Sequence, residues 1–99
     1  MIAIIKCPGK RPEMIEIDNG LTALQGHVGG RIEHYGIGSG IGIVCNEEYM
    51  FAELPFNFVL DGVNMFRGNV LFLNDEGEDF DSLTDKQCEI IMNMFRVIR

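Results

Sequence analysis

Basic residues are scarce in this chain. Eight lysines and arginines stand against 15 aspartates and glutamates in 99 residues, which gives a net charge of -7. Nucleic-acid backbones bind proteins through clusters of lysine and arginine, and the sequence has none beyond Lys6, Lys10 and Arg11. We therefore expect neither direct nucleic-acid binding nor attraction to an anionic membrane surface. A basic protein partner would be favoured electrostatically, and ordinary solubility charge is the alternative explanation of the acidic balance.

Cysteine is also scarce, and no apolar run is long. Cys7, Cys45 and Cys88 lie far apart among apolar neighbours, without a CxxC pair. Their odd number argues against a disulfide framework and favours small buried side chains in a reducing compartment. No stretch approaches the roughly 20 apolar residues of a membrane span, and Met1–Cys7 is too short for a signal peptide. We expect a cytoplasmic protein without a membrane segment.

Apolar residues, by contrast, are plentiful. They make up 46% of the chain and include seven phenylalanines and six methionines. This content is too high for a disordered chain, and 99 residues are enough to build one modest hydrophobic core. We expect a single domain over residues 1–99.

Two strands are predicted at the start of the chain. Met1–Cys7 is a nearly continuous apolar run that Pro8 ends, which is typical of a buried strand. Glu13–Ile17 alternates polar and apolar residues. This alternation predicts a second strand, antiparallel to the first across the intervening turn.

A short helix follows the second strand. Asp18 or Asn19 can cap its N-terminus, because either side-chain oxygen can accept a hydrogen bond from a free backbone N–H. Apolar residues recur at helical spacing from Leu21 to Val28. Gly29 then supplies the left-handed residue that ends a helix.

Four glycines alternate with other residues between the next two predicted strands. Arg31–Tyr35 and Ile43–Cys45 have strand character, and the glycines occupy every second position from Gly36 to Gly42. We expect a hairpin centred near Ser39. A phosphate-binding loop is disfavoured, because the spacing is wrong and a strand follows rather than a helix. Glycines on one strand face could instead let a partner or ligand approach the backbone closely.

The second half contains an irregular segment, a strand and a helix. Glu47–Asn64 reads as an irregular segment that contains many aromatic residues, and Asn69–Asn74 predicts the last strand. The whole order is therefore β-β-α-β-β-loop-β-α. A small, mostly antiparallel sheet with helices packed on one face is the natural α+β solution.

The C-terminal helix is predicted from Ser82 onward and is unusually apolar. Thr84 with Gln87 forms a capping box, and Ser82 with Asp85 offers a second register. A surface helix on a small domain normally needs only one apolar stripe. The excess indicates a second buried contact, and a homodimer through this helix and burial between sheet and loop are equally good explanations.

No catalytic or metal-binding motif is visible. His27 and His34 lack any two-ligand spacing for zinc, and Ser39 lies in a predicted hairpin rather than at a nucleophile elbow. The five acidic residues between Asp75 and Asp81 fit no register of a calcium-binding EF-hand loop. We expect no cofactor and no metal, and the sequence favours a non-enzymatic protein.

Two acidic segments are nevertheless candidates for binding. Asn46, Glu47 and Glu48 follow a predicted strand, where a turn capped by the Asn46 side chain is the simplest explanation. The segment from Asp75 to Asp81 is either a solvated linker or an acidic contact for a basic protein surface.

Several segments, in one order, resemble an uncharacterised domain-of-unknown-function family of small phage, plasmid and gut-metagenome proteins. They are Glu16–Glu33, Ile43–Glu48, Leu54–Asn57, Phe66–Leu73 and Phe80–Asp85. The resemblance covers nearly the whole chain. It implies an accessory gene of a phage or mobile element, and such genes often block host defences.

Two functions of different class follow from the resemblance and the composition. The first is an interaction or inhibitor protein that acts against a host protein with a basic surface. Its binding residues would come from the acidic and aromatic segments: Asn46, Glu47, Glu48, Phe56, Asn57, Phe58, Asp75, Glu76, Glu78, Asp79 and Asp81. The alternative is a small-molecule binder that sequesters a nucleotide signal, with a site formed by Gly29, Gly30, Asn46, Glu47 and Asn57.

Overall fold

The computed structural model describes residues 1–48 and 53–97, which form one five-stranded sheet, one separate hairpin and two helices. The order of strands across the sheet is β2-β1-β7-β4-β3, and every neighbouring pair is antiparallel. The five strands are β1 (Ile2–Lys6), β2 (Glu13–Glu16), β3 (Ile32–Gly38), β4 (Ile41–Asn46) and β7 (Val70–Asn74). The predicted α+β class and the predicted strands of this sheet are confirmed.

Two strands begin in the segment that the sequence predicts as irregular. β5 (Phe56–Leu60) and β6 (Asn64–Arg67) pair as an antiparallel hairpin outside the main sheet. Asp61 and Gly62 form the turn, with φ angles of 55° and 72°. Asp-Gly is a strong signal for such a left-handed turn, so the prediction of a loop through residue 64 was wrong. Residues 49–52 of that segment lie outside the described residues.

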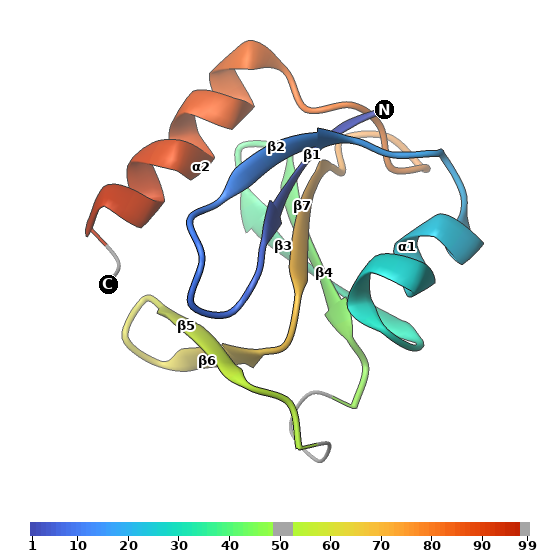
Figure 1. Ribbon diagram of the computed structural model, residues 1–99. Coiled ribbons are helices and arrows are strands. Elements are labelled where there is room, and N and C mark those ends of the chain that lie inside the picture. Colours follow the sequence, from blue (N-terminus) through green and yellow to red (C-terminus); the bar gives the residue numbers. More distant parts are fainter. Residues whose placement is uncertain (49–52, 98–99) are drawn as a thin grey trace.

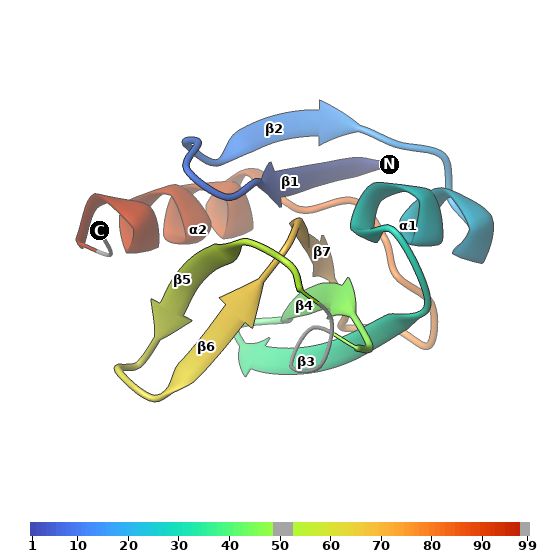
Figure 2. The same cartoon turned by 60° about the horizontal axis from the view of Figure 1, so that its bottom comes forward.

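The two helices cover opposite faces of the sheet (Figure 1), so the expectation that both pack on one face was wrong. Side chains at successive strand positions point to opposite faces. Helix α1 (Leu21–Val28) packs on the face that carries Ala3, Val44 and Leu71. Helix α2 (Asp85–Val97) covers the other face together with the β5–β6 hairpin, which lies beside it in Figure 2.

The burial of the central strands explains the two-sided cover. All six residues of β4 and the first four of β7 are buried. A strand that is apolar on both faces needs a layer of structure on each. A single helical layer would have left one of these faces exposed to water, which is the physical reason that the helices separate.

The N-terminus of α1 differs from its prediction, whereas the C-terminus agrees. Gly20 occupies the N-cap position and no side chain caps the helix, so neither Asp18 nor Asn19 has the predicted role. Gly29 adopts the expected left-handed conformation, with φ of 80°, and donates its N–H to the carbonyl of Gln25.

The predicted hairpin near Ser39 is confirmed. Ser39 and Gly40 both have positive φ angles, of 57° and 69°, and they connect β3 directly to β4. This is the two-residue turn whose twist matches that of the flanking strands.

Burial within the chain accounts for the apolar character of α2. Cys88 and Ile91 are buried in the core, and Ile90, Met92, Met94 and Phe95 pack partly buried against the same core. The sheet and the hairpin supply the second buried contact that the composition of α2 indicates. A homodimer through this helix stays a prediction.

Candidate functional site

The acidic segment is an ordered loop between β7 and α2, closed at its base by backbone pairing. We call residues 75–81 the acidic loop. Asn74 and Asp81 exchange two backbone hydrogen bonds, of 3.1 and 3.0 Å between nitrogen and oxygen. The Asn74 side chain accepts from the Glu76 N–H and donates to the Ser82 carbonyl. One asparagine therefore fixes both ends of the loop.

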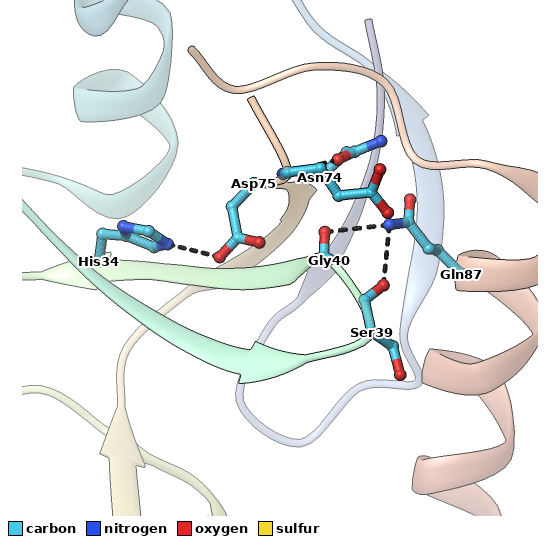
Figure 3. Close-up of polar contacts among 7 residues, drawn as sticks. His34, Ser39, Gly40, Asn74, Asp75 and Gln87 are labelled. Carbon is cyan, nitrogen blue, oxygen red and sulfur yellow. Dashed lines mark hydrogen bonds and ion pairs between the residues drawn. The ribbon is translucent and has the colours of Figure 1, made fainter. Parts of the chain in front are cut away.

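Asp75 joins the loop to the edge of the sheet. Its Oδ2 lies 2.9 Å from Nε2 of His34 (Figure 3). The backbone N–H of Asp75 donates to the carbonyl of Gly40. A methyl group added at Gly42 would lie 2.7 Å from that His34 nitrogen and 2.8 Å from Asp75 Oδ2. A β-carbon at Gly40 would likewise overlap the Glu76 carboxyl. The glycines thus admit a close approach, and the approaching group is the chain's own acidic loop.

Phe80 anchors the loop on its apolar side. Its ring meets the His34 ring edge to face, with centroids 5.0 Å apart and planes at 87°. The same side chain packs against the core on the α1 side of the sheet. With Phe80 and Asp75 turned toward the protein, the remaining carboxylates of the loop are exposed to water: Glu76, Glu78, Asp79 and Asp81.

Gln87 connects the start of α2 to the β3–β4 turn near the loop. The predicted capping box is confirmed, because Gln87 N donates to Thr84 Oγ1 and Thr84 N donates to Gln87 Oε1. Gln87 Nε2 also donates to the carbonyls of Ser39 and Gly40, at 3.1 and 3.0 Å (Figure 3). Sequence reasoning identified the cap but gave no indication of this second role.

Asn46, Glu47 and Glu48 form a separate turn at the other end of β4. Asn46 Oδ1 accepts from Glu48 N at 2.8 Å, so the predicted side-chain cap is confirmed. The Asn46 amide donates to the Val28 carbonyl, and both glutamates are exposed. The six residues of β4 separate this turn from the acidic loop by about 17 Å. The two acidic segments therefore do not form one site.

Asn57 is buried with Lys6. Asn57 Oδ1 accepts from Lys6 Nζ at 3.0 Å, and its amide nitrogen donates to the carbonyls of Lys6 and Gly68. Lys6 is only 8% exposed, and burial lowers the pKa of its ammonium group. Sequence reasoning missed Lys6, although its place two residues after Ile4 in an apolar strand predicts the same inward face.

The two phenylalanines beside Asn57 differ in exposure. Phe56 is 50% exposed, whereas Phe58 is 2% exposed and stacks on Phe66 with centroids 5.1 Å apart. Phe58 and Asn57 therefore belong to the interior and have no surface to offer a partner. Of the three candidates in this segment, only Phe56 remains available.

The described residues hold no group of three or more histidine, cysteine or acidic side chains that could bind a metal ion. The three cysteines are free, and burial raises the pKa of the Cys45 thiol to about 12. Within residues 1–48 and 53–97, no helix has the length and apolarity to cross a membrane.

Comparison with known proteins identifies a family but no characterised relative. No curated protein and no solved structure is significantly similar to the chain. Residues 1–96 match the family model described as a domain of unknown function, DUF3846. This match covers nearly the whole sequence, as the resemblance in the ordered segments implies. The chain therefore belongs to the DUF3846 family.

Proposed function

We propose that this protein is a non-enzymatic interaction protein and that its acidic loop binds a basic surface on another protein. The observation that supports this proposal most strongly is that contacts with the rest of the chain hold the acidic loop in one conformation. Asn74, Asp75 and Phe80 each hold it against the sheet, while four carboxylates face water. Ordering a mobile segment costs free energy on binding, and a loop that is already ordered avoids most of that cost.

The charge of the acidic loop also supports binding of a basic partner, because it raises the rate at which the two proteins associate. Exposed charge pairs contribute little to affinity, about 0.2–1 kcal/mol each. A concentrated patch of one sign, however, steers an oppositely charged partner and raises the association rate by roughly 10-fold or more. The chain's net charge of -7 acts in the same direction. The acidic loop is therefore suited to fast, salt-sensitive capture.

An apolar contact is available on the hairpin, apart from the loop. Phe56, Val63 and Met65 are exposed there, at the end of the molecule away from the acidic loop (Figure 1). A single flat partner surface would not reach both regions, so we assign recognition to the loop and regard the hairpin as a second contact. The resemblance to phage and mobile-element proteins leads us to place the partner among host proteins in the cytoplasm.

A capture experiment with matched charge variants tests the proposal. The loop variant is Glu76→Gln/Glu78→Gln/Asp79→Asn, and the control is Glu13→Gln/Glu16→Gln/Glu89→Gln. Both remove three exposed negative charges, and among the residues that the structure describes neither set of side chains forms a hydrogen bond or an ion pair. Wild type and control, immobilised and exposed to a lysate of cells that carry the gene, should retain the same basic protein, and the loop variant should lose it. Equal retention by all three would contradict the assignment.

A further inference from the structure

Basic side chains gather at the opposite end of this acidic molecule. Arg11 lies in the β1–β2 turn and Arg96 in the last turn of α2, and a pocket of about 570 Å³ lies between them. The β1–β2 turn and the end of α2 lie on the other side of the molecule from the acidic loop (Figure 1). The pocket is thus a cationic site in a chain whose net charge is negative.

Neither guanidinium has an ion-pair partner among the residues that the structure describes. Among the residues that the structure describes, His34 with Asp75 is the sole ion pair within 4.0 Å, and both Arg11 and Arg96 are exposed. Their side chains come from two different elements and line one pocket. Two arginines that line one pocket, with no described carboxylate within 4.0 Å of either, are suited to an anion, because planar guanidinium donors match phosphate in a bidentate geometry.

The remaining walls of the pocket are apolar and one of them is aromatic. Pro12, Met92 and Phe95 complete the lining. The Phe95 ring is held edge to face against Phe58, with centroids 5.0 Å apart, and against Phe72. A wall fixed in this way offers a flat group a surface on which to stack without loss of side-chain freedom.

Lys6 adds a third positive charge next to this wall. Its ammonium nitrogen lies 5.8 Å from the centroid of the Phe95 ring. Its hydrogen-bond acceptors are the Cys7 carbonyl and the Asn57 side chain, both neutral. Buried charges are normally paired with an opposite charge, and no described carboxylate lies within 4.0 Å of this one. An anion in the adjacent pocket would lower the electrostatic cost of burying it.

We propose that the pocket between Arg11 and Arg96 binds a small organic anion that joins one phosphate to a flat aromatic group, the chemistry of a nucleoside monophosphate. The phosphate is held by the two guanidinium groups, and the aromatic group lies on Phe95, Met92 and Pro12. The volume is within the range of roughly 300–1,000 Å³ that small-molecule sites have. A single phosphate is favoured over a polyphosphate, because the net charge of -7 repels each added negative charge.

The pocket is separate from the acidic loop, and its residues are not among those that the sequence indicated as a ligand site. The sequence-based alternative put a nucleotide near Asn46 and Asn57. Both of these side chains are buried and engaged in hydrogen bonds within the chain. The cationic pocket shares no residue with that set.

Titration of the whole chain with adenosine monophosphate, followed by amide NMR and calorimetry, tests the proposal. Adenosine alone and inorganic phosphate alone are the ligand controls. The protein variants are Arg11→Gln, Arg96→Gln and the double variant, with exposed Arg31→Gln as the matched control. Circular dichroism and thermal unfolding check that each variant folds.

The expected result is binding of adenosine monophosphate about tenfold tighter than binding of either control ligand. Its amide shifts should surround Pro12 and Phe95, and its affinity should fall about tenfold in each single arginine variant and be lost in the double variant. Arg31→Gln should bind as wild type does. The proposal is overturned by no binding at millimolar ligand, by equal binding of phosphate or adenosine alone, or by arginine variants that bind normally.

Discussion

At the scale of single residues, glycine and asparagine place the charged groups of this protein. Asn74 closes the acidic loop, Asn46 caps the turn after β4, and Asn57 accepts from the buried Lys6. The cap at Asn46 could be predicted, because an asparagine after a strand satisfies backbone groups two residues on. The other two pairings could not, since they join residues 51 apart in sequence or depend on how the loop folds back.

Gly42 and Gly26 should respond to alanine in opposite directions. A β-carbon at Gly42 would collide with both members of the His34–Asp75 pair, and we expect Gly42→Ala to lower the free energy of unfolding by about 1–3 kcal/mol. Gly26 lies inside α1 with no atom within 4 Å of such a carbon. Gly26→Ala should therefore raise the free energy of unfolding by about 0.5–1 kcal/mol. Urea unfolding measures both, and a neutral Gly42→Ala would show that the close approach is not required.

The three thiols should differ in reactivity. Burial raises the pKa of Cys45 to about 12, so this thiol stays protonated in the folded protein as pH rises past 9, and burial also raises the pKa of Cys88. Because the thiolate is the reactive form, a disulfide reagent at pH 8–9 should modify the half-buried Cys7 first. All three should react in denaturant. Rapid modification of Cys45 in the folded protein would contradict its burial.

The same shift in pKa makes stability depend on pH. Between the ordinary thiol pKa of 9.0 and about 12, Cys45 is ionised in the unfolded chain and protonated in the fold. Cys45 therefore lowers the free energy of unfolding by about 1.4 kcal/mol for each pH unit in this window. Lys6 has the opposite effect, because burial lowers the pKa of its ammonium group below the ordinary value of 10.5. As the pH falls below 10.5, the contribution of Lys6 to the free energy of unfolding decreases.

At the scale of elements, the strands of the main sheet and both helices follow from their sequence patterns. The continuous apolar runs of β1 and β7 predict buried strands, and Thr84 with Gln87 predicts the start of α2. The β5–β6 hairpin was missed because Pro55 suggested a break, although the aromatic residues favour strands and Asp61-Gly62 is a hairpin turn signal. The uncapped start of α1 has no sequence signal, since two better caps precede Gly20.

The start of α2 should be more sensitive at Gln87 than at Thr84. Thr84→Ala removes one cap, which costs about 1 kcal/mol. Gln87→Ala removes the other half of the box and the donor to the Ser39 and Gly40 carbonyls, so we expect a loss of about 2–4 kcal/mol in the free energy of unfolding. Gln25→Ala in α1 is the control and should change it by less than about 0.5 kcal/mol. Similar costs at Thr84 and Gln87 would argue against the link to the turn.

At the scale of the whole molecule, the acidic loop and the pocket between Arg11 and Arg96 lie at two ends of a two-sided fold. The acidic loop lies near one end of the sheet, and Arg11 with Arg96 lies at the other (Figure 1). The α+β class could be predicted from the order of the predicted strands and helices. The opposite placement of the helices could not, because it depends on which face each connection crosses. The pocket between Arg11 and Arg96 likewise needs the fold, since these two residues lie 85 positions apart in the sequence.

Association kinetics of the captured partner test the central claim, recognition by the acidic loop, most directly. We expect the association rate of wild type to fall steeply with added salt, because a Debye length of about 8 Å at physiological salt screens exposed charges. Neutralising Glu76, Glu78 and Asp79 should lower the rate by about tenfold at low salt and flatten its salt dependence. The control with Glu13, Glu16 and Glu89 neutralised should stay close to wild type. The same rate and salt slope in both variants would contradict recognition by the loop.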